Sequence, residues 1–123
     1  MTSSTVVALV VLPQRYNPDA KGERRRVEDA KFEKTMGEIA VQFGGGVLWR
    51  HDAAPPRGFW WDRGVLYADE ITVVEVDIPN DATAKEWLIQ YARNILGPRF
   101  KQKAIYLKFL GPIEVDVVTV DIE

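Results

Sequence analysis

The residues that could do acid–base or anion chemistry gather in one loop. His51 is the sole histidine of the chain, and it stands between Arg50 and Asp52, a few residues before Arg57. A histidine held by a carboxylate can act as a general base, and neighbouring guanidinium groups can bind an anion. The alternative is an ordinary exposed loop histidine. The pattern predicts His51 and Asp52 as catalytic candidates, and Arg50 and Arg57 as ligand-binding candidates.

A second candidate segment runs from Arg57 to Arg63 and combines two arginines with Phe59, Trp60 and Trp61. Such a mixture can stack on a planar ring and pair with a phosphate or carboxylate. It also suits a protein interface, or simple packing within a hairpin. We therefore add Trp60, Trp61 and Arg63 to the ligand-binding candidates. Because neighbouring strand residues face opposite sides, we expect at least one of the two tryptophans to lie outside the core.

Three other clusters have structural explanations. Asp62, Asp69 and Glu70 could hold a hard cation, but they lack the spacing of a calcium loop and are typical of a solvated turn. The basic run at 24–26 has acidic neighbours and little glycine, which favours a solvated loop over a phosphate site. The glycines at 44–46 follow a helical pattern, which is the wrong order for a nucleotide-binding motif and suits a helix end.

The composition removes several kinds of chemistry. The chain has no cysteine, so disulfides, thiolate metal sites and a cysteine nucleophile are excluded. One histidine cannot form a histidine-based metal site, and the serines, Ser3 and Ser4, stand near the amino terminus outside any nucleophile-elbow sequence. We expect neither a metal site nor a cofactor.

Length and charge favour one small soluble domain. The 123 residues lie in the common size range of single domains, and we treat 1–123 as one domain. The formal net charge of -2 and the pI of about 5.5 argue against a nucleic-acid binder, which usually carries a basic surplus. The apolar run at 6–12 is too short for a signal sequence or a membrane span. We expect a cytoplasmic protein without a membrane segment.

Two segments have the apolar spacing of an amphipathic helix. The first lies within 27–43, where Asp29 is a candidate N-cap or first-turn acid and the glycines that follow predict the end. The second follows Asn80 and Asp81, either of which can cap it, and Gly97-Pro98 predicts its end.

The other apolar runs predict strands. Residues 6–12 are a continuous aliphatic run, as in a central strand, and 47–50 form a short strand candidate. Residues 59–61 and 65–78 flank a turn at 62–64. A bulge or second turn could interrupt the longer of these at 68–70, and its better core face consists of Val74, Val76 and Ile78.

The carboxyl-terminal part predicts two further strands. Residues 104–110 alternate between apolar and polar side chains, Gly111-Pro112 predicts a turn, and 113–122 alternate again as a last strand.

The order of these elements predicts an α+β fold. It is a ferredoxin-like sandwich, βαββαβ with an extra C-terminal strand, and two helices lie on one face of a mainly antiparallel sheet. The other face of the sheet is left to solvent or to a partner.

Four features carry a family resemblance: Val27-Glu28-Asp29-Ala30-Lys31-Phe32, Phe43-Gly44-Gly45-Gly46, a hairpin between Trp49 and Trp61, and residues 75–79. With these features the stretch 27–109 resembles a bacterial family of small ferredoxin-like domains of unknown function. The segment 55–61 departs from that pattern. The resemblance implies the fold and no activity.

Two functional hypotheses of different kinds follow. The first is a small interaction or ligand-binding module, expected to be a homodimer because edge strands pair readily and 113–122 would add such an edge. The second is an enzyme or nucleotide-binding protein that acts on an anionic small molecule through Arg50, His51, Arg57 and residues 60–63. A nucleic-acid binder that uses the sheet face ranks last because the net charge is negative.

Overall fold

The aliphatic run near the amino terminus becomes the centre of the sheet. In the computed structural model, which describes residues 4–51 and 53–122, this strand is β1 (Thr5–Pro13). Its side chains alternate strictly between buried and partly exposed, because only one of its two faces is covered by helices. The even-numbered side chains from Val6 to Leu12 therefore point into the core.

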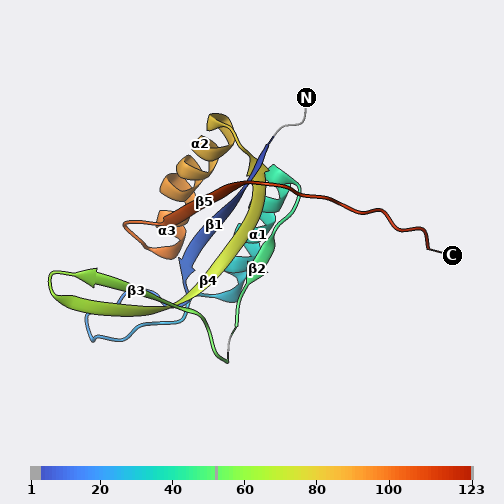
Figure 1. Ribbon diagram of the computed structural model, residues 1–123. Coiled ribbons are helices and arrows are strands. Elements are labelled where there is room, and N and C mark those ends of the chain that lie inside the picture. Colours follow the sequence, from blue (N-terminus) through green and yellow to red (C-terminus); the bar gives the residue numbers. More distant parts are fainter. Residues whose placement is uncertain (1–3, 52, 123) are drawn as a thin grey trace.

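The sheet is antiparallel throughout the described residues, and its strand order is β2-β4-β1-β5 (Figure 1). A further strand, β3, pairs only with β4. The other elements are α1 (Asp29–Phe43), β2 (Val47–Trp49), β3 (Arg57–Asp62), β4 (Val65–Pro79), α2 (Ala82–Tyr91), η1 (Ala92–Leu96), α3 (Gly97–Phe100) and β5 (Tyr106–Ile113). This arrangement confirms the predicted α+β fold class.

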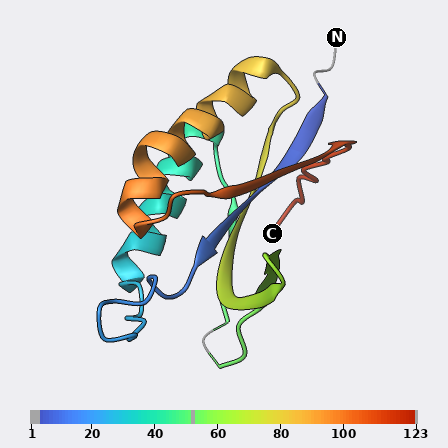
Figure 2. The same cartoon turned by 90° about the vertical axis from the view of Figure 1, so that its left-hand side faces the viewer.

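The helices form one layer on one face of the sheet (Figure 2). The buried side of α1 carries Phe32 and Ile39, and the buried side of α2 carries Leu88, so both predicted stripes face the core. Val74, Val76 and Ile78 meet them from β4, as predicted. No helix of the described chain is long and apolar enough to cross a membrane.

The helix ends were predicted with mixed success. Gly44 ends α1 in the left-handed conformation, and Asp81 caps α2 by accepting a hydrogen bond from the Ala84 amide at 2.8 Å. The prediction that Gly97-Pro98 ends the second helix is wrong. A π-helical turn, η1, carries the chain through Gly97 to Phe100, and the Gly97 amide bonds to the Ala92 carbonyl. The wider turn accommodates a proline that lacks an amide donor.

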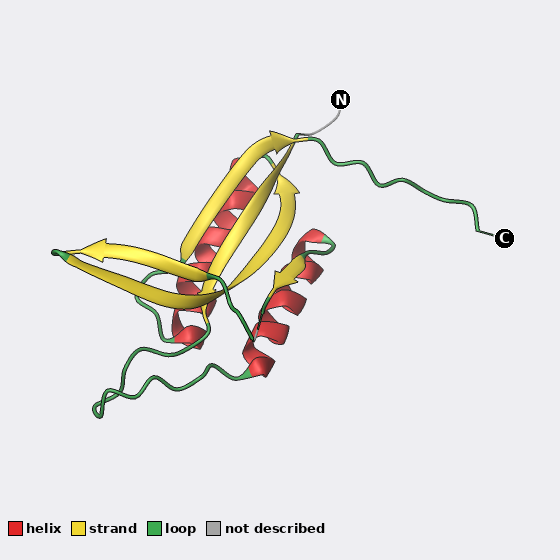
Figure 3. Ribbon diagram, turned by 60° about the horizontal axis from the view of Figure 1, so that its bottom comes forward, coloured by secondary structure: helices red, strands yellow, loops and turns green. Residues whose placement is uncertain are grey.

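The hairpin of β3 and β4 extends beyond the four-stranded body of the sheet (Figure 3). Its turn consists of Arg63 and Gly64, both with positive φ, which is the geometry that joins twisted antiparallel strands. Strand β4 runs through 68–70 without a second turn. Its residues 71–79 pair with β1, and its residues 65–70 pair with β3. This continuity lets one long strand support both the sheet and the hairpin.

The carboxyl-terminal prediction needs two corrections. Gly111-Pro112 is not a turn but part of β5, where the pairing with β1 shifts register between Thr5 and Val7. Residues 114–122 form no strand and run away from the body of the protein (Figure 1). A strand needs a neighbour for its backbone groups, and no described strand lies beside this segment. We call residues 114–122 the C-terminal segment.

Candidate functional site

The hairpin carries its aromatic side chains on two opposite faces. Trp60 lies directly across from Tyr67, whereas Trp61 lies across from Leu66 on the other face. Both tryptophans lie outside the core, and Trp61 is 72% exposed. One compact ligand cannot contact both indole rings, so the structure separates two residues that the sequence grouped together.

The predicted loop residues are also dispersed. Arg50 lies beside the start of α1. Its guanidinium is 2.5 Å from the Asp29 carboxylate and 4.7 Å from the centre of the Phe32 ring. The hydrogen bond and charge of Arg50 lower the pKa of Asp29. His51 is exposed in the loop, and Asp52 lies outside the described residues. Arg50 therefore anchors the loop to the helix.

The two other arginine candidates lie on the hairpin. Arg57 is exposed at the start of β3, opposite Glu70, and its guanidinium lies 5.5 Å from the centre of the Phe59 ring. Arg63 occupies the turn at the tip. The catalytic and ligand-binding roles expected for these residues stay predictions.

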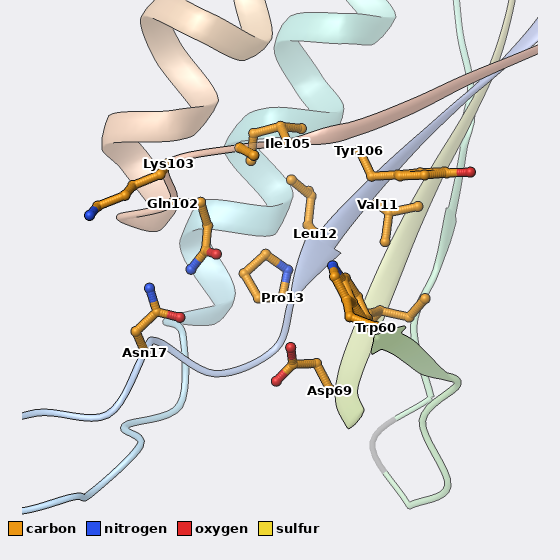
Figure 4. Close-up of a pocket in the computed structure, with 12 residues that line it drawn as sticks. Val11, Leu12, Pro13, Asn17, Trp60, Asp69, Gln102, Lys103, Ile105 and Tyr106 are labelled. Atoms are coloured by element: carbon orange, nitrogen blue, oxygen red, sulfur yellow. The ribbon is translucent and has the colours of Figure 1, made fainter. Parts of the chain in front are cut away.

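A cavity of about 380 Å³ lies where the hairpin meets the sheet, and of the predicted candidates Trp60 lines it (Figure 4). Tyr106 from β5 stands on the same side as Trp60, while Asn17, Gln102 and Lys103 lie toward the other end. The floor is formed by apolar side chains, among them Val11, Pro13, Ile71 and Ile105. Aromatic walls at one end and polar groups at the other could hold a small planar molecule.

The charges around this cavity leave a positive surplus. The carboxylate of Asp69, in the lining, pairs with Arg24 at 2.6 Å. Within residues 4–51 and 53–122, Lys103 has no carboxylate within ion-pair distance. Sequence reasoning missed Lys103, Gln102 and Asn17, because they come from two loops far apart in the chain and no spacing connects them.

The C-terminal segment is the most exposed apolar part of the described chain. Val117 is 86% exposed and Ile122 is 91% exposed. Val118 and Val120 are also mostly exposed, and Val115 is about half exposed. Valine and isoleucine favour a paired, half-buried strand. The residue types therefore suit a strand, but no described strand of the same chain pairs with the segment.

A groove of about 500 Å³ runs along the outer edge of β5. Its apolar wall consists of Ile105, Leu107 and Phe109 from the β5 side and of Ile89 and Ala92 from the helical layer. Arg93 and Lys103 stand on its rim. Strand β5 pairs with β1 on one side, and no described strand pairs with its other side.

Comparison with known proteins supports the fold alone. No protein family matches the sequence, and no curated protein matches it. Among solved structures, the chain is similar to the divalent cation tolerance protein Cut A1 from Thermus thermophilus, with a TM-score of 0.57 and 10% sequence identity. The match covers 91% of this chain and 87% of that chain. At this identity the likeness supports a ferredoxin-like architecture and carries no activity with it.

Proposed function

We propose that this protein is an interaction module that works as a homodimer. The observation that carries the proposal is the C-terminal segment, in which Val117, Val118, Val120 and Ile122 are each 70% or more exposed. Contiguous exposed apolar surface of this kind marks interaction sites. A partner that covers the segment would stabilise both the apolar side chains and the backbone groups of a strand.

A second copy is the partner that the chain itself favours. Among the described residues, the segment has no partner strand and β5 has none on its outer edge, so two copies can satisfy each other reciprocally. Closed two-fold symmetry is the commonest arrangement of soluble homo-oligomers. The segment is acidic, with Glu114, Asp116 and Asp121, whereas the groove along β5 has basic residues on its rim.

Size-exclusion chromatography with light scattering on the full chain at micromolar concentration tests the proposal. We expect a mass twice the 14.0 kDa of one chain. A strict monomer across the concentration range would overturn the homodimer. The cytoplasmic location and the bacterial source expected from the sequence are not tested by this experiment and stay predictions.

The cavity beside Trp60 favours a second candidate function, the binding of a small aromatic anion. Trp60 and Tyr106 can stack on a ring, and Lys103 supplies a positive charge at the other end. A mononucleotide and an aromatic carboxylate share this chemistry. This candidate keeps the anionic ligand predicted from the sequence but moves its site from the arginine loop to the cavity.

Thermal-shift measurements with adenosine monophosphate, adenosine, benzoate and benzamide separate these ligands. Binding at 100 times the dissociation constant should stabilise the protein by about 2.7 kcal/mol. We expect the anionic member of one pair to raise the melting temperature, and Trp60→Ala to abolish the shift. Trp61→Ala is the matched control, since Trp61 lies on the opposite face of the same strand. No shift with any of the four compounds would refute this candidate.

A further inference from the structure

We infer that the C-terminal segment of one copy pairs as an antiparallel strand with the outer edge of β5 in a second copy. Its apolar side chains Val118, Val120 and Ile122 would then enter the groove between β5 and the helical layer. This inference rests on the proposed homodimer and specifies the contact that forms it.

The outer edge of β5 is a suitable acceptor. In the described chain this strand is the last in the order β2-β4-β1-β5, so one row of its backbone groups has no strand partner. Such an edge is a template for an added strand. The segment cannot reach the edge of its own β5, because it continues directly from the end of that strand without a reversal. The acceptor must therefore belong to another molecule.

The groove matches the segment in polarity and charge. Ile105, Leu107 and Phe109 are partly buried and present apolar surface beside the edge. The segment contains Glu114, Asp116 and Asp121 and no basic residue. Arg93 and Lys103 line the groove, so the segment and the groove carry net charges of opposite sign. Apolar burial would supply affinity, and the opposite charges would favour this partner over others.

The register shift in β5 decides which side chains of the segment can enter the groove. Leu110 pairs with Val7 and Ile113 pairs with Thr5, so one extra residue lies between them and the alternation of facing is inverted after Gly111. If the alternation continues from Ile113, the even-numbered residues of the segment lie on the helix side of the sheet. Leu107 and Phe109, which lie opposite buried Val10 and Ala8, are on that same side.

One register satisfies these constraints with two-fold symmetry. It places Val118 opposite Phe109, Val120 opposite Leu107 and Ile122 opposite Ile105, all on the helix side. On the other face it places Val117 opposite Leu110, Thr119 opposite Lys108 and Asp121 opposite Tyr106. Apolar side chains thus meet apolar side chains along the groove, and Asp121 lies diagonally from Lys108.

Neighbouring registers bring unfavourable side-chain contacts or the wrong facing. A shift by two residues in one direction sets Asp116 against Phe109, and a shift in the other direction sets Asp116 against Glu114 of the partner. A shift by one residue moves the apolar side chains to the wrong face. Because β5 carries one extra residue, Gly111 and Pro112 together lie opposite Asp116 of the partner in the chosen register. The two copies of Glu114 then lie opposite each other at the two-fold axis, which is an unfavourable contact.

The first experiment changes a residue that enters the groove. Val120→Asp should raise the dimer dissociation constant about a hundredfold, because the carboxylate would be buried against Leu107. Val41→Asp is the matched control, since Val41 is 89% exposed on α1 and lies outside the groove. Circular dichroism and the melting temperature verify that both variants stay folded. Mass by light scattering and sedimentation then gives the dissociation constants.

The second experiment measures the register directly. The chain has no cysteine, so a variant with Lys108→Cys and Thr119→Cys carries the only two thiols. Mild oxidation should convert the dimer to a covalent dimer, visible on a non-reducing gel. Lys34→Cys with Thr119→Cys is the control, because Lys34 lies on the exposed side of α1.

The outcomes separate this inference from the proposed homodimer. A dimer that is lost in Val120→Asp and is cross-linked through 108 and 119 supports both. A wild-type dimer that forms no 108–119 cross-link, or that is as stable in Val120→Asp as in Val41→Asp, overturns the β5-edge contact and leaves the homodimer standing. A monomeric wild-type chain overturns both.

Discussion

The guanidinium of Arg99 lies 2.6 Å from the carboxylate of Glu38 and joins the last turn of the helical layer to the middle of α1. Arg99 also donates to the Thr35 hydroxyl at 2.8 Å, and the Tyr91 hydroxyl donates to Glu38 at 2.8 Å. The Arg99 side chain is largely buried. This contact exists because the helix continues through Gly97 and Pro98 instead of ending there.

Replacement of Arg99 should weaken the fold. We expect Arg99→Met to lower the free energy of unfolding by about 2 kcal/mol, since the buried hydroxyl of Thr35 and the carboxylate of Glu38 would each lose a charged donor. Urea denaturation followed by circular dichroism gives the value. Lys34→Met, at an exposed position on α1, is the control and should change the free energy by less than about 0.5 kcal/mol. Equal effects of the two substitutions would mean that the Arg99 contacts do not stabilise the protein.

The stability should fall in acid partly through Glu28. The hydrogen bond from Tyr16 is the main cause that lowers the pKa of Glu28 from 4.5 to about 2, and the charges of Lys31 and Arg25 add to it. The unfolded chain therefore binds more protons than the folded chain in this range. The stabilisation from Glu28 is complete above pH 4.5 and is lost as the pH falls toward 2.

Glu28→Gln tests this dependence, because glutamine has no carboxyl group to titrate. Melting temperatures between pH 5 and pH 2 should fall less steeply for this variant than for wild type. Glu33→Gln, on the exposed side of α1, should keep the wild-type slope. If Glu28→Gln and wild type lose stability in parallel, the contact with Tyr16 does not persist in solution.

Substitution by alanine should change the free energy of unfolding in opposite directions at two glycines, one within α1 and one at its end. Gly37 lies within α1, and an added Cβ there would meet no atom within 4 Å, so Gly37→Ala should raise the free energy of unfolding by about 1 kcal/mol. Gly44 has a φ of +93°, so Gly44→Ala should lower the free energy of unfolding by about 1 kcal/mol or more. Chemical denaturation of both variants measures the difference. Two changes of the same sign would contradict this description of the helix end.

Glu114 should oppose dimer formation in the inferred register. Because the two copies of Glu114 lie opposite each other at the two-fold axis, Glu114→Gln should tighten the dimer by about two- to fivefold. Sedimentation equilibrium measures the change, which should shrink at high salt. Glu33→Gln carries the same charge change outside the contact and should leave the dissociation constant unaltered. Weaker association of Glu114→Gln would place the axis elsewhere.

The local signals of the sequence were accurate where they concerned one element at a time. Periodicity located β1, α1 and β4, and it identified Val74, Val76 and Ile78 as the buried side of β4. It failed at Gly97-Pro98, because a π-helical turn can absorb a proline when tertiary contacts such as that of Arg99 with Glu38 hold the continuation.

The candidate site was predicted in composition but not in arrangement. The sequence singled out Arg50, Trp60 and Trp61 as a possible group, yet the structure places Arg50 against Asp29 and turns the two indole rings to opposite faces. The neighbours of Trp60 in the cavity, among them Lys103, come from distant segments. Only the folding of the chain brings such residues together, so no spacing in the sequence could reveal them.

By itself the sequence determined which residues form strands and helices and which side of each is apolar, because these follow from backbone periodicity and from local caps and turns. The tertiary structure decided how those elements meet. Among the described strands, it left none beside the outer edge of β5 and none beside the alternating residues 114–122. Strand formation depends on backbone groups from a second segment, and for residues 114–122 no described part of the same chain supplies them.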